Sequence, residues 1–344
     1  MNIALIVDSY KSWTGGPSVI LRETKKSLQK KKIKISIITS DLLNKKKLLF
    51  KSKLNKFDIC HLYGGWTLFH IKTFLTAFLL KKKIIIHPLG FYEPWSLGQK
   101  KIKKTIAWNA YQFRILSNAD LIHCASKTEE KNILKISKSF NTKVLPYGIS
   151  NEAIKKVISK KKVKKKAVFF SRIHKKKGIG NLISAWKKVD NPEWHLDIYG
   201  PTEDKKYLND LMLSVNKNNK ITFHKPIFNT KKKYRTLEKY DFMILPTYSE
   251  NFGYIVLESL ARGVPVLTTK NTPWLEIKKK NSGWISDNSV GSMTRSLKKI
   301  FYLSKKNNNY FYSKSKNAIK HAQNYNWNSL SNSYLEVYKK ILNE

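Results

Sequence analysis

The sequence predicts an α/β protein with two doubly wound, Rossmann-like domains that face a cleft. Short apolar segments alternate with amphipathic segments along the whole chain, which is the pattern of strands and helices in parallel-sheet domains. The alternation dissolves once, soon after residue 147, and then restarts. A chain of 344 residues is also long enough for two domains, each with its own core.

The first domain is predicted to span residues 1–150. Short apolar runs between polar breaks indicate six strands, at residues 3–7, 33–38, 57–61, 83–87, 121–123 and 143–145. Helical patterns lie between them, at residues 17–30, 68–80, 101–116 and 126–136. Ser126, with Glu129 three residues later, has the form of a capping box at the start of the last of these helices.

Residues 151–166 are predicted to form a linker, because Gly, Asn, Ser and lysine runs replace the periodic pattern there. The second domain is predicted at residues 167–324. Its strands are expected at residues 167–171, 195–199, 221–223, 242–245, 264–267 and 283–285. Its helices are expected at residues 179–189, 205–215, 231–237, 254–261 and 290–302. The tail is predicted to form two more helices, of which the last, about 325–344, packs back on the first domain.

The composition is that of a globular protein, with 41% hydrophobic and 12% aromatic residues. Cys60 and Cys124 lie in apolar, strand-like segments, so we interpret them as buried side chains in a reducing cytoplasm. The N-terminus begins with a strand and has no features of a signal peptide, which indicates a cytoplasmic protein. The longest apolar run, residues 68–80, contains His70 and Lys72 and is too short to cross a bilayer.

The charge is strongly positive, with 67 Lys and Arg against 23 Asp and Glu, a net charge of +44. Biased residue usage is one interpretation, because lysine clusters occur in every region of the chain. Attraction to an anionic membrane surface is another, and it would make the protein peripheral on the inner face of the membrane. Nucleic acid is the partner with least support, since no binding motif for it accompanies the charge.

Two carboxylates eight positions apart, Glu250 and Glu258, are the most informative feature of the sequence. Asn251, Phe252 and Gly253 form a predicted turn between them, after one strand and before one helix. The N–H groups at a helix N-terminus can meet anionic or hydroxyl-rich ligands. Both carboxylates are therefore expected near the same edge of the sheet, one for each of two parts of a ligand.

The alternative is that these two glutamates are solvated charges whose spacing arose by chance. The segment that follows favours a ligand-binding site, because another short strand at residues 264–267 completes a strand–helix–strand unit. Such folds bind ligands at the carboxyl ends of their strands.

Two glycine turns are weaker candidates for ligand contact. Gly15 and Gly16, before Pro17, follow the first strand and open the first helix. Glycine there lets a ligand approach the backbone closely, although an ordinary turn explains the pair equally well. Gly200 ends the second strand of the second domain, where it forms either a plain turn or the place where a nucleotide passes.

The loop after the first strand of the second domain is basic. Arg172 and Lys177 lie on it, and cations at this point can clamp a diphosphate through charge-assisted hydrogen bonds. Arg172 is the more informative of the two, because arginine is scarce in this lysine-rich chain.

Together these motifs resemble the retaining glycosyltransferases of family 4, the glycosyl transferases group 1, which have the GT-B fold. The resemblance covers essentially the whole chain and is clearest at residues 15–17, 171–178, 199–201, 245–261 and 263–269. Further segments resemble a subset that glycosylates bacterial surface polysaccharides. These segments are 90–97, 119–120 with His123, and Thr272-Pro273-Trp274 with Gly283-Trp284.

The resemblance implies a role for each candidate residue. Arg172 and Lys177 would bind the diphosphate of a nucleotide sugar and stabilise the leaving group, and Gly200 would lie beside the nucleotide. Glu258 would hold the ribose hydroxyls. Glu250 would hold the donor sugar.

Four further residues would lie close to the donor in this family. Asn251 and the amides near Phe252 and Gly253 would contact the donor sugar, and Gly16 would let the donor lie against the backbone. No metal and no cofactor is implied, because the nucleotide sugar is a co-substrate. The sequence also has no Asp-x-Asp element of the kind that metal-dependent enzymes of the other glycosyltransferase fold use.

One position departs from the subset's pattern. A histidine that contacts the donor sugar usually precedes glycine after the fourth strand, and here Leu89 precedes Gly90. His87 lies two residues earlier and is either a substitute catalytic residue or a core histidine. A different acceptor geometry, an unusual sugar and weak or absent activity all remain open.

The predicted function is transfer of a sugar, with retention, from a nucleotide-diphosphate sugar to a surface glycan or a lipid-linked saccharide precursor. Two alternatives remain: a catalytically silent nucleotide-sugar-binding protein and a sugar-nucleotide epimerase of the same fold.

Overall fold

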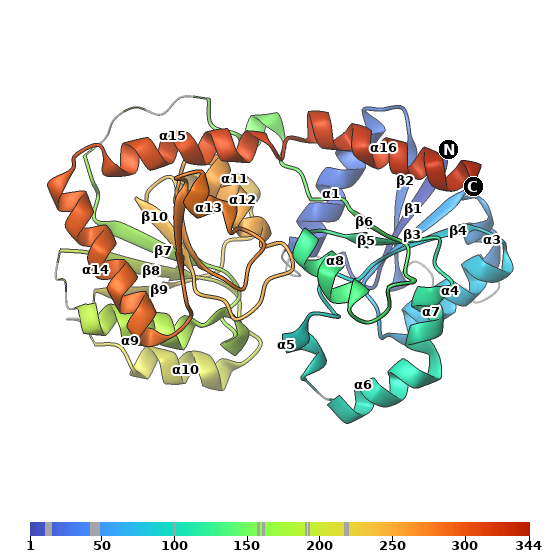
Figure 1. The fold of residues 1–344 in the computed structure, drawn as a ribbon, viewed down its shortest axis with the longest axis horizontal. Coiled ribbons are helices and arrows are strands. Elements are labelled where there is room, and N and C mark those ends of the chain that lie inside the picture. Colours follow the sequence, from blue (N-terminus) through green and yellow to red (C-terminus); the bar gives the residue numbers. More distant parts are fainter. Residues whose placement is uncertain are drawn as a thin grey trace. The chain divides into compact units, whose positions relative to one another are not determined.

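The computed structural model describes residues 1–10, 16–41, 49–99, 101–156, 159, 162–189, 191, 193–216 and 220–344. It divides into two compact units, residues Met1–Gly148 with Trp327–Glu344 and residues Ile149–Asn326. Each unit contains a six-stranded parallel sheet with helices on both faces (Figure 1). The predicted fold class, α/β with two doubly wound units, is confirmed.

The sheet of the first unit has the order β2-β1-β3-β4-β5-β6, and all neighbouring strands are parallel. Its central strands are buried almost throughout, as expected when helices cover both faces of a parallel sheet. The strands are β1 (Asn2–Val7), β2 (Lys34–Thr39), β3 (Ile59–Tyr63), β4 (Lys83–His87), β5 (Leu121–Cys124) and β6 (Thr142–Val144).

The helices of the first unit are α1 (Gly16–Gln29), α3 (Leu49–Asn55), α4 (Leu68–Leu79), α5 (Pro94–Leu97), α6 (Lys101–Ala107), α7 (Phe113–Ser117), α8 (Lys127–Leu134) and α16 (Trp327–Asn343). The single helix predicted over residues 101–116 is wrong in detail, because a π-helical turn, Trp108–Gln112, separates α6 from α7. Helices α3 and α5 were not predicted.

The Ser126 cap predicted at the start of α8 is confirmed. The side chain of Ser126 accepts a hydrogen bond from the N–H of Glu129 at 3.1 Å. The Glu129 carboxylate accepts from the N–H groups of Gly90 and Ala125, at 2.8 and 2.7 Å. Glu129 therefore joins the loop after β4 to the end of β5.

The sheet of the second unit has the order β12-β11-β10-β7-β8-β9 and is also parallel throughout. Its strands are β7 (Lys166–Phe170), β8 (His195–Tyr199), β9 (Ile221–His224), β10 (Phe242–Leu245), β11 (Val266–Thr269) and β12 (Gly283–Ser286). Its helices are α9 (Ile179–Val189), α10 (Lys205–Leu213), α11 (Thr230–Leu237), α12 (Tyr254–Ala261), α13 (Glu276–Lys279), α14 (Val290–Lys306) and α15 (Tyr310–Gln323). Helix α13 was not predicted.

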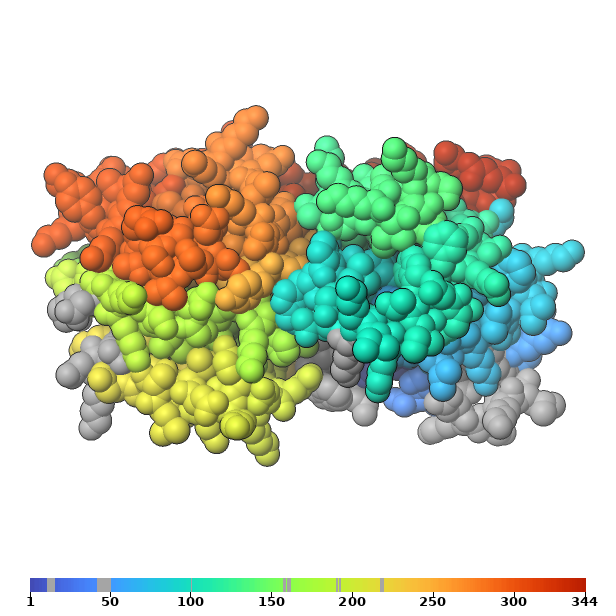
Figure 2. Space-filling model, turned by 60° about the horizontal axis from the view of Figure 1, so that its bottom comes forward, coloured from blue at the N-terminus to red at the C-terminus, as the bar shows by residue number. Residues whose placement is uncertain are grey.

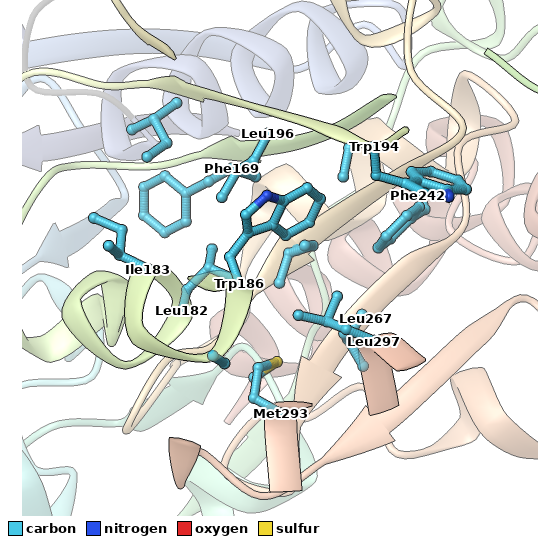
Figure 3. Close-up of a cluster of buried hydrophobic side chains, with 14 of the residues drawn as sticks. Phe169, Leu182, Ile183, Trp186, Trp194, Leu196, Phe242, Leu267, Met293 and Leu297 are labelled. Atoms are coloured by element: carbon cyan, nitrogen blue, oxygen red, sulfur yellow. The ribbon is translucent and has the colours of Figure 1, made fainter. Parts of the chain in front are cut away.

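Large aromatic side chains fill one face of this sheet, under α9 and α14 (Figure 3). Trp194 stacks on Phe301 with ring centroids 4.4 Å apart, and Phe242 packs on Trp194 at 5.6 Å. Trp186, on α9, makes an edge-to-face contact with Phe301, with ring centroids 5.5 Å apart. This packing anchors the helices on the sheet. The loops at the carboxyl ends of the strands carry most of the candidate site residues of this unit.

Helix α16 belongs to the first unit although it comes from the end of the chain. Trp327, Tyr334 and Tyr338 are buried in the same core cluster as β1 and β3. The hydroxyl of Tyr338 lies 3.0 Å from Nδ1 of His61, in β3.

Cys60 and Cys124 are both buried and free, and burial raises the pKa of Cys60 to about 12. Among the helices of the described residues, none is both long enough and apolar enough to cross a membrane.

Candidate active site

Two loops at the carboxyl edge of the second sheet are bound to each other. The N–H of Tyr248, after β10, donates to the carbonyl of Lys176, after β7, at 2.8 Å, and the hydroxyl of Thr247 donates to the same oxygen at 3.1 Å. Gly178 has a φ of +67°, and a Cβ there would lie 2.0 Å from the carbonyl oxygen of Pro246. Only glycine allows this approach, so the contact between the loops depends on it.

Lys177 and Glu250, one from each loop, form an ion pair. Their side chains are 10% and 13% exposed, so the pair is largely shielded from solvent but keeps a face open to it. The structure therefore brings together two candidate residues that lie 73 positions apart in the sequence. A shielded, charge-assisted bond of this kind fixes the position of both side chains.

Arg172 lies on the same loop as Lys177 and is exposed. Burial, and then the charge of Arg172, lower the pKa of His174. The neutral ring accepts a hydrogen bond at Nδ1 from the N–H of Lys176, at 3.1 Å, and so caps the short turn that carries Lys177.

The turn after Glu250 is fixed by contacts to the segment after β11. The N–H of Glu250 donates to the carbonyl of Asn271 at 3.1 Å. The indole N–H of Trp274 donates to the carbonyl of Phe252, which is buried. Gly253 has a φ of +74° and starts α12, as the sequence predicts. Asn251 is partly exposed on the turn.

Glu258 lies one turn into α12 and is 2% exposed. Both of its carboxylate oxygens approach Nζ of Lys233, at 2.5 and 2.6 Å. Lys233, on α11, did not emerge from the sequence analysis. It is the third of three consecutive lysines, 231–233, and only its helical register toward α12 distinguishes it from the others.

Gly200 joins the ends of β7 and β8. A Cβ at this position would lie 1.7 Å from the carbonyl oxygen of Ser171, so no other residue fits without movement of the backbone. The N–H of Ile173 donates to the carbonyl of Pro201 at 2.9 Å, which holds the loop of Arg172 beside this turn. The close approach at Gly200 is thus one of backbone to backbone.

The candidates of the first unit are less tightly defined. Gly15 lies outside the described residues. Gly16 is the first residue of α1, and nothing lies within 4 Å of a Cβ built on it. Gly16 is therefore not required by packing inside its own unit.

His87 is fully buried, and both of its ring nitrogens are hydrogen-bonded. Nδ1 donates to the carbonyl of His123 at 2.6 Å, and Nε2 accepts from the hydroxyl of Tyr147. The His87 and His123 rings also stack, 4.0 Å apart. With both ring nitrogens hydrogen-bonded and no exposed surface, His87 has the contacts of a core histidine, one of the two interpretations that the sequence left open.

Leu89 and Gly90 both have left-handed backbone conformations, with φ of +55° and +77°. For a bulky residue such as Leu89 this conformation is unusual and costs roughly 1–2 kcal/mol. The strained position is the one at which the sequence departs from the surface-polysaccharide subset.

Among the side chains that the structure describes, no three or more His, Cys, Asp or Glu residues are grouped so as to hold a metal ion.

Comparisons with known proteins agree with this architecture. The model of the family "Glycosyl transferases group 1" matches residues 150–323, half of the chain. A Klebsiella pneumoniae protein described as an uncharacterized 41.2 kDa protein in the cps region is 25% identical over 304 residues, which are 83% of this chain and 80% of that protein.

Solved structures share the fold over nearly the full length. Anabaena HepE, crystallised with UDP-glucose, has 16% sequence identity and a TM-score of 0.77, and the match covers 99% of this chain and 100% of that one. WaaG, a glycosyltransferase involved in lipopolysaccharide biosynthesis, has 14% identity and a TM-score of 0.72, with 97% and 99% covered. The chain belongs to the glycosyl transferases group 1 family and has the GT-B fold.

Proposed function

We propose that this protein is a retaining, family 4 glycosyltransferase that moves a sugar from a nucleoside-diphosphate sugar to a surface glycan or a lipid-linked saccharide precursor. The observation that supports this most is the convergence of Lys177, Glu250 and Glu258 at one edge of the second sheet. Lys177 and Glu250 form an ion pair there, and Glu258 lies one turn into α12, the helix that follows the turn.

The diphosphate is assigned to the basic loop after β7. Arg172 is exposed, and the ammonium of Lys177 is held in place by Glu250, so both cations can face an anionic ligand. As the bond between the sugar and the diphosphate breaks, negative charge grows on the leaving group, and fixed cations stabilise it. Gly200 lies beside this loop and leaves its end free of side chains.

The sugar is assigned to the turn between β10 and α12. Glu250 accepts hydrogen bonds from hydroxyl groups of the sugar there, and the N–H groups near Phe252 and Gly253 donate to the sugar oxygens. Asn251 contacts the sugar on the same turn. Glu258 accepts hydrogen bonds from the ribose hydroxyls. Hydroxyl groups bind carboxylates through charge-assisted hydrogen bonds, which contribute roughly 1.5–3 kcal/mol each.

The names of related proteins support both substrate classes. HepE was crystallised with UDP-glucose, which is a donor of the proposed class. WaaG is involved in lipopolysaccharide biosynthesis, and the Klebsiella relative is encoded in a cps region. A saccharide acceptor destined for the cell surface is the proposal that fits both.

Transfer is proposed to need no metal ion and no cofactor. Arg172 and Lys177 supply positive charge at the position where a metal-dependent enzyme would place a cation on the diphosphate. Turnover that is unchanged by excess EDTA supports this, and turnover that is lost with EDTA and restored by Mg²⁺ or Mn²⁺ contradicts it.

A cytoplasmic site of action, peripheral on an anionic membrane, is proposed from one surface of the first unit. Ile102 and Ile106 lie one helical turn apart on α6 and are 79% and 65% exposed. The flanking Lys101 and Lys103 are exposed too. The teal segment that includes α6 lies on the visible face of its unit in Figure 2. Apolar side chains between lysines are typical of helices that lie in the interface of an anionic bilayer.

A catalytically silent binding protein is the second candidate. The observation that favours it is Leu89, which occupies a strained position where the surface-polysaccharide subset carries a histidine. A sugar-nucleotide epimerase of the same fold has no specific observation in its favour.

A screen of nucleotide sugars separates these candidates. The purified protein is incubated with UDP-, GDP- and ADP-sugars, and released nucleoside diphosphate and sugar are measured. Slow hydrolysis of one donor, or transfer to added lipid-linked saccharide, supports the glycosyltransferase. Nucleotide binding without turnover of any donor supports the silent protein, and a changed sugar still attached to its nucleotide supports the epimerase.

A further inference from the structure

Two ion pairs join helices α11 and α12, one midway along the helices and one at their C-terminal ends. Lys233 pairs with Glu258 about one turn into each helix, and Arg262 pairs with Glu238 at the C-termini. Each helix follows a strand of the parallel sheet, so the N-termini lie at the carboxyl edge of that sheet. The Lys233 pair thus lies one turn closer to the edge assigned to the donor than the Arg262 pair, which caps the opposite ends of the helices.

The two pairs differ in burial. The Glu258 side chain is 2% exposed, whereas that of Glu238 is 27% exposed. A carboxylate as buried as that of Glu258 is costly without a counter-ion, and Lys233 provides one to both oxygens. A carboxylate has about four lone-pair sites, so a lysine counter-ion and ribose hydroxyls can bind to one carboxylate together.

We propose that Lys233 is a positioning residue of the nucleoside subsite, whose ammonium holds the buried carboxylate of Glu258 in place for the ribose hydroxyls of the donor. The inference rests on the proposed function, in which Glu258 binds the ribose. Without Lys233 the carboxylate takes up a proton or turns away, and either change removes acceptors that face the ribose. The diphosphate contacts come from a different loop and remain.

The test compares one nucleoside diphosphate with its 2′-deoxy form. Calorimetry with UDP, GDP and ADP first identifies the nucleotide that the wild-type protein binds most tightly. That nucleotide and its 2′-deoxy counterpart are then titrated into the wild type and Lys233→Met. The wild type is expected to prefer the ribose form by about tenfold, as one charge-assisted hydrogen bond provides. Lys233→Met is expected to lose most of this preference.

Two further variants separate positioning from a structural role. Arg262→Met removes a cation from the pair at the C-terminal ends of the same helices, so it is expected to lower thermal stability and keep the ribose preference. Lys233→Arg retains a cation and is expected to restore most of the preference. If Lys233→Met does not fold, Lys233→Gln replaces it in the comparison.

The outcomes are distinct. A lower melting temperature in Lys233→Met with the full ribose preference of the wild type overturns the inference and leaves the proposed function standing. A wild-type protein that binds none of the nucleoside diphosphates overturns the proposed function itself.

Discussion

The indole N–H of Trp274 donates a hydrogen bond to the carbonyl oxygen of Phe252, 22 positions earlier in the chain. Trp274 is almost completely buried, and its ring also contacts Phe252, at a centroid distance of 5.3 Å. The turn that carries Glu250 is thus fixed by a hydrogen bond and a ring contact from a buried side chain.

Replacing Trp274 by phenylalanine is expected to loosen this turn. The carbonyl of Phe252 would lose its buried donor, which costs about 1–3 kcal/mol of folding free energy. Because Glu250 lies on the same turn, kcat with the donor identified by the screen should fall about tenfold. Denaturant unfolding and steady-state kinetics measure the two effects.

Trp284→Phe is the matched control. The indole of Trp284 also donates a hydrogen bond, which is partly buried, to the hydroxyl of Tyr310 at 2.8 Å. It should lower stability and leave kcat close to that of the wild type. Equal loss of kcat in both variants would argue that Trp274 acts through general stability alone.

Two glycines are expected to respond to alanine in opposite ways. Gly200→Ala places a Cβ 1.7 Å from the carbonyl oxygen of Ser171 and should destabilise the protein by about 1–3 kcal/mol or prevent folding. Gly16→Ala meets nothing within 4 Å, so stability should be unchanged or slightly higher. If Gly16 faces the donor, Gly16→Ala should nevertheless slow turnover. Full turnover in this variant would remove Gly16 from the donor site.

Acid is expected to destabilise the first unit through three buried histidines. Burial lowers the pKa of His61, His87 and His123, the last to about 4, while in the unfolded chain each titrates near 6.5. Between these values the unfolded state binds more protons, so stability is full above about pH 6.5 and falls as the pH drops toward 4. The free energy of unfolding, measured in urea from pH 7.5 to 5, should therefore decrease.

A hydrogen-bond chain explains why these rings stay neutral. The hydroxyl of Tyr338 donates to His61, the other nitrogen of His61 donates to His123, and His123 donates to the carbonyl of Leu145. His123→Gln should reduce the pH slope, because it removes one of the buried rings whose pKa is lowered. A stability that is constant from pH 7.5 to 5 would contradict this account.

Membrane attachment is expected to depend on α6. Replacing Ile102 and Ile106 together by serine should reduce flotation of the protein with anionic phosphatidylglycerol vesicles, and high salt should weaken binding of the wild type. Leu213→Ser is the control, because Leu213 is 85% exposed but lies in the second unit. Equal flotation of the double variant and the wild type would contradict attachment through α6. Biased residue usage would then be the better explanation of the positive charge.

The sequence predicted the regular elements well where the physical signal is local. Strands β4, β8 and β10 and helices α9 and α12 have the predicted bounds, because apolar runs and glycine or proline breaks mark them directly. The single helix predicted over residues 101–116 was interrupted by a π-helical turn, which leaves no trace in the hydrophobic pattern. The four-residue helices α5 and α13 are too short for any periodicity to appear.

The candidate site residues also differ in whether the local sequence reveals them. The motif around Glu250 and Glu258 was visible because turn residues separate a strand from a helix. Lys233 was not, since lysines occur throughout the chain and only the packing of α11 on α12 selects this one. The left-handed backbone at Leu89 also had no sequence signal, because leucine rarely adopts it and tertiary contacts impose it.

The most direct test of the donor site is calorimetric titration of the nucleoside diphosphate into the wild type, Glu258→Ala and Glu250→Ala, with turnover measured on the same samples. Glu258→Ala should weaken binding about tenfold or more, because it loses charge-assisted hydrogen bonds to the ribose. Glu250→Ala should bind the nucleotide nearly as well as the wild type but lose most of its turnover. Unchanged affinity in Glu258→Ala, or full turnover in Glu250→Ala, would contradict the division of the donor between these two carboxylates.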